Sequence, residues 1–447
     1  MIFYFYLSYK SSSFLNNSDD EEDQKNKENK ENTLHDTNNS KFKNSINVRS
    51  IYHISNAPII STKGKIWPLS KFEKIDVLKC AINGKNIEYL QNIEKEIKQS
   101  MMIFPVEIFV KIFDILNSWD KLKPKFMRVC KLFYYIIMPM IYKDPYLRAT
   151  NFLNFVETLS NNKKLGNYIY SLDLAYVIQS GKNAFVARLL KQSRKNLEVF
   201  VAPQTSFGFG PLVALKNCSN LKILDLRLVS ETLNLTQLFH SIENLKHLTH
   251  LSFPRSSIDI EDHNKISWPP KLNFLRLSGG INDDFLYHSN FPQSITNLEF
   301  AHCPAITDLG LKQVLYRVGN QLTTLKIQYP MPALKNNSLD DVFIYCANLR
   351  VLEVSVDYLS SMFFDDQYLG YTDGRPLRTL YINSSGMLGT TTRLDPMDLA
   401  VAIDDGRLPF LKNIQCTAKL GWDPKSEAVT FIADELDERG GGLYIGY

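Results

Sequence analysis

The chain has 447 residues, of which 44% are hydrophobic, so it is long enough for several domains or for one elongated array with a continuous core. Its 51 basic and 47 acidic residues leave a net charge of only +4, which argues against a broad polyanion-binding surface, and we expect no nucleic-acid partner. The six cysteines form no CxxC pair and have no spacing suited to zinc, so we expect reduced thiols and no metal site.

Residues 1–74 are mostly polar, and the run "NNSDDEEDQKNKENKEN" has too little apolar area to offset the entropy of ordering, so we expect a disordered tail. The opening "MIFYFYLSYK" lacks the basic start and the cleavage site of a secretion signal. No segment approaches the ~20 apolar residues of a membrane span, so we expect no membrane partner and a location in the cytoplasm, the nucleus or both. Residues 75–98 follow as a helical lead-in, with one apolar face formed by Ile87, Leu90, Ile93 and Ile97.

Residues 99–148 predict a pair of helices. Pro105 suits the first turn of the first helix, and Glu107 complements the positive end of its dipole. The apolar stripe of this helix is Ile108, Ile112, Ile115 and Leu116, and "NSWD" ends it. The second helix has an apolar side made of Val129, Cys130, Phe133, Ile136 and Ile137. So short a unit makes a poor independent core, so we expect it to pack against a partner or a neighbour.

A linking helix is predicted next, because apolar residues in "NFLNFVETLSNN" recur at helical spacing. These residues are Phe152, Phe155, Val156 and Leu159. A helix here would join the preceding unit stiffly to the C-terminal part of the chain.

From residue 169 onward the chain repeats the pattern L-x-x-L-x-L, with conservative apolar replacements. The pattern begins at residues 169, 197, 221, 248, 272, 295, 322, 349, 377 and 411. Successive starts are 23 to 28 residues apart except for the last, at 34, and 20 to 29 residues is the period of leucine-rich repeats. The fourth and sixth residues of each match share one side of a strand and point inward, so the strands should stack into a parallel sheet whose inner face needs covering. Residues 149–447 therefore predict an α/β solenoid.

The returning segments differ between repeats. Thr307 is a candidate N-cap for a helix with Leu311, Val314, Leu315 and Val318 inward, ended by Gly319. Ser338 is a candidate cap for a second helix, which buries Leu339, Val342, Phe343 and Cys346 and stops at Asn348. Prolines in "WPPKLNFLRL" and "FPQSITNLEF" predict loops in the short repeats that begin at residues 248 and 272. A last helix, with Val429, Ile432, Ala433 and Leu436 on one face, predicts a terminal cap.

"FPVEIFVKIFDILNSWDKL" followed by "RVCKLFYYI" resembles an F-box, with Phe104 where that family has leucine. The repeats resemble the cysteine-containing subclass of leucine-rich repeats, with Cys303 and the following "ITDLGL" as the matching residues. Together the two resemblances cover residues 102 to 447 and indicate an F-box protein with leucine-rich repeats.

That resemblance implies a non-catalytic substrate receptor of an SCF-type cullin-RING ubiquitin ligase. The F-box would bind the adaptor subunit and, through it, the cullin, while the repeats would bind a protein substrate. The residues that match the family's adaptor contacts are Phe104, Pro105, Glu107, Ile108, Ile112, Phe113, Leu116 and Leu122. The alternative for these positions is an ordinary amphipathic hairpin that packs on the chain's own core.

The residues that flank the inward leucines should face out from the concave side of the sheet. They are Asp173, Asp225, Arg227, Arg276, Glu299, Lys326, Gln328, Glu353, Ser355 and Tyr381. Their mixed signs favour a protein or peptide ligand with its own charge pattern, although any one of them could be merely a solvated strand residue.

Motifs for catalysis or for cofactor binding are missing from the sequence. There is no GxxxxGK[ST], HExxH or GxSxG, and "SFGFGP" at residues 206–211 predicts a loop without a following helix. Cys303 fits a buried structural thiol better than a nucleophile. We therefore expect no cofactor and no catalysis by the chain itself. A binding scaffold that does not lead to degradation remains the main alternative, and an enzyme acting on a small molecule ranks third.

Overall fold

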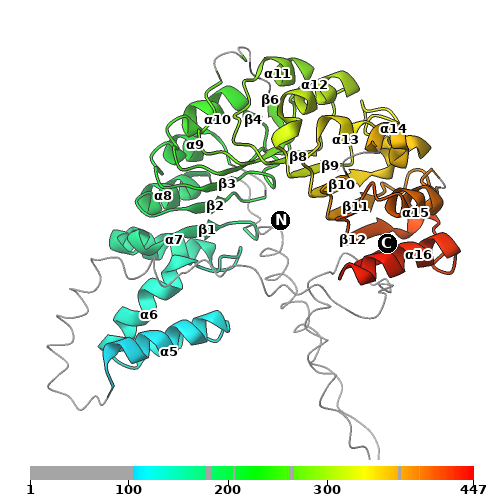
Figure 1. Ribbon diagram of the computed structural model, residues 1–447. Coiled ribbons are helices and arrows are strands. Elements are labelled where there is room, and N and C mark those ends of the chain that lie inside the picture. The colour runs from blue at the N-terminus through cyan, green and yellow to red at the C-terminus, as the bar shows by residue number, and fades with distance from the viewer. Residues whose placement is uncertain are drawn as a thin grey trace, which may run out of the picture.

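A computed structural model gives the structure of the protein and describes residues 104–446, apart from 178–182, 205–206, 259, 261–262, 264–265, 371–373 and 392. The predicted disordered tail, 1–74, and the lead-in helix, 75–98, lie outside the described residues. The described chain forms an N-terminal helical unit, residues 104–148, followed by a curved repeat array, residues 149–446 (Figure 1).

Eleven parallel strands form the inner layer of the arc, and each pairs with the next along the chain. They are β1 (Ser171–Asp173), β2 (Val199–Val201), β3 (Ile223–Asp225), β5 (His250–Ser252), β7 (Phe274–Leu277), β8 (Asn297–Ala301), β9 (Thr324–Gln328), β10 (Val351–Ser355), β11 (Thr379–Asn383), β12 (Asn413–Thr417) and β13 (Gly442–Gly446). A small second sheet pairs β4 (Leu233–Asn234) with β6 (Ser257–Ile258). The α/β solenoid prediction is confirmed, and β13 adds a strand beyond the ten sequence matches.

Inward burial follows the repeat pattern. The fourth residue of every match is buried, for example Leu224, Leu298 and Leu352, and so is the sixth, for example Leu226, Phe300 and Val354. All of these belong to one continuous hydrophobic core. Neighbouring strands are about 4.8 Å apart whereas packed helices need about 8–10 Å, so the strand side is the shorter, concave side of the arc.

Helices and short 3₁₀ turns form the outer layer (Figure 1). The α-helices are α7 (Phe152–Asn161), α8 (Asn183–Ser193), α9 (Phe209–Leu215), α10 (Leu235–Ile242), α11 (Asp283–His288), α12 (Asp308–Val318), α13 (Val342–Tyr345), α14 (Asp366–Leu369), α15 (Pro396–Asp404) and α16 (Glu427–Glu438). The 3₁₀ turns of the array are η4 (Lys163–Tyr168), η6 (Gly319–Gln321), η7 (Val356–Tyr358), η8 (Ser361–Phe364) and η9 (Ala418–Leu420). The predicted linking helix, α7, and the predicted terminal cap, α16, are both present.

The helical return after β8 forms as predicted. The Thr307 hydroxyl accepts a hydrogen bond from the backbone N–H of Leu309 at 3.3 Å, and Gly319 ends α12. The next return differs from its prediction, because α13 has only four residues and begins after Asp341. Ser338 is therefore not its N-cap; the Ser338 hydroxyl instead donates to the Asp308 carboxylate of the preceding repeat. The four residues predicted to be buried in this return are buried.

Two loop predictions are wrong. The repeat that begins at residue 272 contains α11, whose N-cap Asn282 accepts a hydrogen bond from the backbone N–H of Phe285 at 2.8 Å. Helix α9 begins at Phe209, inside "SFGFGP", directly after Gly208. One or two helical turns fit even a short return, so repeat length does not by itself exclude a helix.

The repeat that begins at residue 248 has no α-helix among its described residues, as predicted. Its Trp268 ring packs against aromatic rings of the neighbouring repeats. The Trp268 ring lies 4.9 Å from the Phe239 ring and 5.4 Å from the Phe291 ring, centroid to centroid. These large side chains keep the core continuous across this repeat.

Candidate functional site

The N-terminal helical unit consists of α5 (Val106–Ser118), the 3₁₀ turn η3 (Pro124–Arg128) and α6 (Lys131–Lys143). Its small core joins α5 to α6 through aromatic contacts. The Phe133 ring lies 4.8 Å from the Phe113 ring and 5.3 Å from the Phe109 ring. Val106 and Phe113 are the residues of α5 that this core buries. Val129, predicted on the apolar side of the second helix, instead precedes α6 and is exposed, so that part of the prediction is wrong.

Three isoleucines on α5 remain exposed to solvent. Ile108, Ile112 and Ile115 are 43%, 44% and 40% exposed. Their i, i+4, i+7 spacing places them along one face of the helix, which we call the α5 apolar row. Phe104 extends this exposed apolar surface before the helix, and Trp119 does so after it. The α5 apolar row belongs to neither hydrophobic core of the described residues, and adaptor contact by these positions stays a prediction.

The other predicted adaptor contacts occupy different environments. Pro105 is at the N-cap position of α5, and Glu107 lies exposed in its first turn. Leu116 and Leu122 are half-buried against the unit's core. Phe113 is buried in that core, so its role here is to support α5 and not to form part of the exposed face. Trp119 was not among the predicted contacts, although a tryptophan directly after a predicted helix was a visible signal.

Helix α6 connects the helical unit to the array. Ile136 and Ile137 belong to the core of the helical unit, whereas Met138 is buried in the core of the array. The Lys143 carbonyl accepts a hydrogen bond from the backbone N–H of Tyr170, just before β1, at 3.0 Å. One helix thus contributes to two cores, which makes the connection between them stiff.

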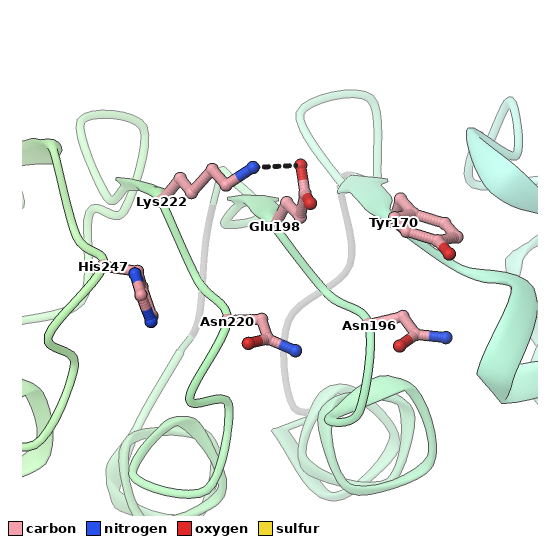
Figure 2. Close-up of a pocket in the computed structure, with 6 residues that line it drawn as sticks. All are labelled: Tyr170, Asn196, Glu198, Asn220, Lys222 and His247. Atoms are coloured by element: carbon pink, nitrogen blue, oxygen red, sulfur yellow. Dashed lines mark ion pairs between the residues drawn. The ribbon is translucent and has the colours of Figure 1, made fainter. Parts of the chain in front are cut away.

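A shallow pocket of about 310 Å³ lies where the first strands begin. Figure 2 shows Asn196 and Asn220 on successive loops beneath an ion pair between Glu198 and Lys222, whose charged atoms are 2.9 Å apart. The Asn196 amide donates to the Asn167 carbonyl and the Asn220 amide donates to the Lys195 carbonyl, each at 2.6 Å. These asparagines tie neighbouring repeats together, so their presence at the pocket is explained by the stacking of the repeats and does not indicate a ligand site.

The strand register places most of the predicted concave-face residues in one row. Following the paired positions from β1 to β13, this row reads Asp173, Val201, Asp225, Ser252, Arg276, Glu299, Lys326, Glu353, Tyr381, Gln415 and Tyr444. Gln328 and Ser355 lie two residues farther along their strands, and Arg227 follows β3. The prediction that these residues share the strand side opposite the core is confirmed for this row.

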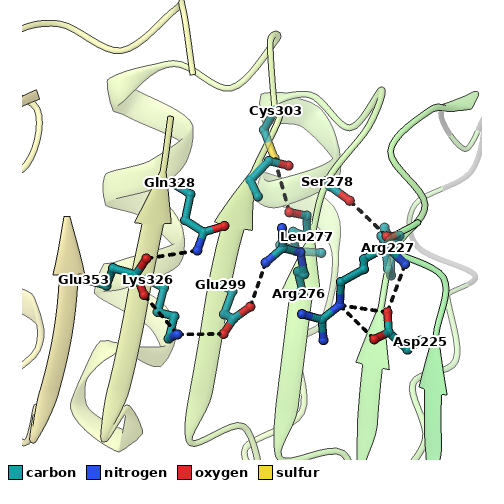
Figure 3. Close-up of polar contacts among 12 residues, drawn as sticks. Asp225, Arg227, Arg276, Leu277, Ser278, Glu299, Cys303, Lys326, Gln328 and Glu353 are labelled. Atoms are coloured by element: carbon teal, nitrogen blue, oxygen red, sulfur yellow. Dashed lines mark hydrogen bonds and ion pairs between the residues drawn. The ribbon is translucent and has the colours of Figure 1, made fainter. Parts of the chain in front are cut away.

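Charges of opposite sign alternate in the middle of this row and pair with one another (Figure 3). Arg276 Nη1 lies 3.0 Å from Glu299 Oε2. Lys326 Nζ lies 3.6 Å from Glu299 Oε1 and 2.9 Å from Glu353 Oε2. The Gln328 amide donates to Glu353 Oε1 at 3.0 Å. We call Arg276, Glu299, Lys326 and Glu353 the charge ladder.

The two central charges of the ladder stabilise each other's ionised form. Burial alone would raise the pKa of Glu299, but Lys326 and Arg276 outweigh burial and lower it. Burial alone would lower the pKa of Lys326, but Glu353 and Glu299 outweigh burial and raise it. Glu299 and Lys326 therefore both stay charged at neutral pH.

Pairing within the row corrects one expectation about the concave face. Asp225, Arg276, Glu299 and Ser355 were expected to face out as ligand contacts, yet all four are buried. The Ser355 hydroxyl donates to Asp357, and Asp225 forms an ion pair with Arg227 at 2.8 Å. Asp173, Arg227, Lys326, Gln328, Glu353 and Tyr381 are partly exposed. The repeat pattern predicts the face on which each residue lies but not the pairing that covers it.

Cys303 behaves as a structural thiol. Burial raises its pKa to about 12, which removes the thiolate that a nucleophile requires. Its Sγ lies 3.5 Å from the Leu277 carbonyl of the preceding repeat. The adjacent His302 has left-handed backbone, with φ of 56°, and its ring lies beside Arg255. The expectation of a buried structural cysteine is confirmed.

Metal sites and membrane spans are both absent from the part of the chain that the structure describes. No group of three or more histidine, cysteine, aspartate or glutamate side chains among the described residues is arranged to hold a metal ion. None of the helices that the structure describes is long and apolar enough to cross a membrane.

Comparison with known proteins finds one family profile and two yeast relatives. The sequence profile of the COS11 F-box domain matches residues 101–180. An F-box protein of Saccharomyces cerevisiae, YDR306C, is 44% identical over 375 residues, which cover 83% of this chain and 76% of that protein. The protein pof5 of Schizosaccharomyces pombe is 35% identical over 350 residues, covering 77% of this chain and 99% of pof5.

Among solved structures, the crystal structure of the Rad7 and Elc1 complex in yeast covers 75% of this chain and 91% of its own matched chain, at 14% identity. The TM-score of that match is 0.38. This chain belongs to the F-box protein family.

Proposed function

We propose that this protein is the substrate-recognition subunit of an SCF-type cullin-RING ubiquitin ligase. In this proposal the α5 apolar row binds the adaptor subunit and, through it, the cullin, while the repeat array binds a protein substrate. The observation that carries the proposal is the exposure of Ile108, Ile112 and Ile115 on the domain that defines the family. A partner that buries this exposed isoleucine row removes apolar surface from water, and this favours formation of the complex.

The stiff connection through α6 supports the same function. Ubiquitin transfer needs a substrate lysine held near the loaded conjugating enzyme, and a rigid spacer raises its effective concentration there. Met138 fixes the helical unit to the array's core, and the Tyr142 ring stacks 5.9 Å from the Phe155 ring of α7. In this proposal the chain itself performs no catalysis, and the assembled ligase transfers ubiquitin.

The first test measures adaptor binding by the full chain and by an Ile108→Ala/Ile112→Ala double variant. We expect the intact chain to bind the purified adaptor and the variant to bind at least about tenfold more weakly, because two partly exposed isoleucines lose their contribution to the interface. Ile344→Ala is the matched control, because Ile344 is 54% exposed on α13 in the array. An intact chain that binds no adaptor would overturn the proposal.

The second test separates a degradation receptor from a non-degradative scaffold. Proteins that bind residues 149–447 should accumulate when the full-length protein is removed from cells, and should return to their former level when it is restored. Restoration of the Ile108→Ala/Ile112→Ala variant should leave them elevated. Ligands whose abundance does not change in either case would favour the scaffold.

A further inference from the structure

The segment between α5 and α6 holds an exposed cluster of positive charge. Residues 120–131, "DKLKPKFMRVCK", contain five cations and one carboxylate, which is a net charge of +4. The whole chain also has a net charge of +4, so its other residues balance one another. All five cations are exposed, and we call them the basic loop: Lys121, Lys123, Lys125, Arg128 and Lys131.

The backbone holds these cations close together. Lys125 and Arg128 lie three residues apart on the 3₁₀ turn η3, where residues at this spacing share one face. Lys121 lies two residues before Lys123, whose backbone is extended, and this spacing places side chains on the same side. Helix α6 then begins with Lys131, and its first turn contains no acidic residue that would offset the positive end of its dipole.

The basic loop has no counter-charge within the part of the chain that the structure describes. None of its five cations forms an ion pair with a carboxylate of the described residues. Lys326 of the charge ladder, by contrast, has two carboxylates within 3.6 Å. Like charges that are held together without a counter-charge repel one another, so an anionic partner would be favourable.

The side chains between the cations favour an acidic peptide as that partner. Leu122, Phe126 and Met127 pack against the core of the helical unit, and Val129 is the large apolar residue that residues 120–131 leave exposed. The surface of the basic loop is therefore mainly charged. A bilayer would instead be bound by several exposed apolar side chains that insert between the lipids.

The chain itself contains a segment of complementary charge. Residues 19–23, "DDEED", are its longest run of acidic residues and lie outside the described residues; we call them the acidic run. Roughly eighty residues separate this run from Phe104, a length that permits contact within one molecule at a high effective concentration. The acid-rich stretch 434–438 is less suited, because Glu435 already pairs with Arg439 at 3.0 Å and α16 lies at the opposite end of the arc (Figure 1).

We propose that the basic loop binds the acidic run of the same chain and that this contact covers Trp119, at the end of the α5 apolar row. The second part rests on the proposed function, because it takes that row as the adaptor-binding surface. Lys121 connects the two surfaces, since its Nζ lies 5.5 Å from the centre of the exposed Trp119 ring. A carboxylate that pairs with Lys121 therefore lies against Trp119, and an adaptor that extends over Trp119 displaces the run.

The contact is tested in the full chain with a water-soluble carbodiimide, which joins a carboxylate to a lysine amine when the two are in contact. Mass spectrometry of a mixture of isotope-labelled and unlabelled chains identifies the joined peptides. We expect the acidic run to be joined to the basic loop within one chain, about fivefold or more often than to Lys163 and Lys164, two exposed lysines of η4. Salt at about 0.5 M should suppress these cross-links, because it screens exposed charges.

Charge reversal in the basic loop provides the matched variants. Lys123→Glu/Lys125→Glu should reduce cross-linking at the other lysines of the loop about fivefold, because a single exposed ion pair is weak and the cations act together. Lys163→Glu/Lys164→Glu is the control and should leave the cross-links at the basic loop unchanged. Circular dichroism and the urea midpoint check that both variants fold.

A charge swap tests whether the two segments face each other. Adding Asp19→Lys/Asp20→Lys to the Lys123→Glu/Lys125→Glu chain should restore cross-links between the two segments, now from the new lysines to the new glutamates. Restoration would not be expected if the basic loop met a different partner.

Adaptor binding tests the masking of Trp119. A chain whose acidic run is changed to the corresponding amides should bind the purified adaptor about threefold or more tightly than wild type, because the run no longer occupies part of the surface. Glu28→Gln/Glu31→Gln, in the same N-terminal segment, is the control and should bind the adaptor as wild type does.

Several outcomes would overturn the inference. The contact is wrong if the acidic run joins the basic loop no more often than it joins Lys163 and Lys164, or if the cross-links connect labelled to unlabelled chains. Loss of the cross-links on addition of phosphatidylserine-containing vesicles or of a single-stranded oligonucleotide would assign the basic loop to that partner instead. Equal adaptor binding with and without the charges of the run would contradict the masking. A wild-type chain and an amide variant that both bind no adaptor would contradict the proposed function, while the cross-links still decide whether the contact forms.

Discussion

Glu299 occupies the strand side that the repeat pattern predicts, but it does not have the predicted role of an exposed ligand contact. It lies on the concave side of β8, as the repeat pattern predicts, but its carboxylate contacts Arg276 and Lys326 and is almost completely buried. Buried charges of this kind are costly unless every partner is present. Its first effect is therefore on the stability of the array.

We expect Glu299→Gln to lower the free energy of unfolding by about 3–5 kcal/mol, because it leaves the buried Arg276 without its counter-charge and removes one of the two carboxylates beside Lys326. Urea unfolding at pH 7 measures the change. Glu243→Gln is the control, since Glu243 pairs with Lys216 at 3.4 Å on the exposed surface and its loss should cost about 1 kcal/mol or less. Equal losses of unfolding free energy in Glu299→Gln and Glu243→Gln would contradict a stabilising role for the charge ladder.

At the scale of elements, four aspartates tie successive repeats together between residues 272 and 385. Asp283 accepts hydrogen bonds from the backbone N–H and the hydroxyl of Thr307, at 2.9 and 2.6 Å. Asp357 accepts the same pair from Ser385, at 2.9 and 2.5 Å. Further examples of such a carboxylate-to-hydroxyl contact are Asp308 with Ser338 and Asp340 with Ser360. These contacts fix the stacking of the C-terminal half of the array.

We expect Asp357→Asn to lower the free energy of unfolding by about 2 kcal/mol at pH 7, because hydrogen bonds to a charged acceptor are the stronger ones. Burial alone would raise the pKa of Asp357, but the hydroxyls of Ser355 and Ser385 outweigh burial and lower it. A lowered folded pKa contributes stability above the unfolded value of about 4, and this contribution is lost as the pH falls through the folded pKa.

The difference between wild type and Asp357→Asn should therefore shrink when urea unfolding is repeated below pH 4. Asp404→Asn, an exposed aspartate in α15, should change the free energy of unfolding by less than about 0.5 kcal/mol at either pH. A difference for Asp357→Asn that stays constant across this range would contradict an ionised acceptor.

At the scale of the whole molecule, the array is nearly one-dimensional. Each strand pairs only with its two neighbours, so contacts between distant repeats do not help to hold the arc (Figure 1). At the C-terminal end, α16 covers the core of the last repeats with Val429, Ile432 and Leu436, and β13 follows it.

We expect Leu436→Ala, at a fully buried position, to destabilise the last repeats by about 2–5 kcal/mol. Because coupling passes only between neighbours, amide hydrogen exchange should become faster in β11, β12 and β13 and stay unchanged in β1 to β3. Asp434→Ala, an exposed position on the same helix, should leave exchange unchanged throughout. Uniform acceleration across all strands would show that the array unfolds as one unit.

The repeat architecture and the helical unit could be predicted from sequence because both depend on local apolar periodicity. Alternation in "LEF" places Leu298 and Phe300 inward, and the spacing after Thr307 places α12, since side-chain direction follows directly from backbone geometry. Membership of the cysteine-containing repeat subclass stays a prediction. The sequence did not predict α11 after β7 or the start of α9. Proline and glycine indicate where a helix is disfavoured, but they do not show that one or two helical turns can still form beside them.

The sequence by itself determined which side of each strand faces the core, because that depends on the spacing of apolar residues along the chain. Only the tertiary structure decided which polar residues meet. Arg276, Glu299 and Lys326 are more than twenty residues apart in sequence and become neighbours through parallel register. Likewise, Phe113 and Ile112 are adjacent and both apolar, yet packing against α6 buries one and leaves the other exposed. Burial and pairing depend on what lies opposite, and that is fixed only when the chain has folded.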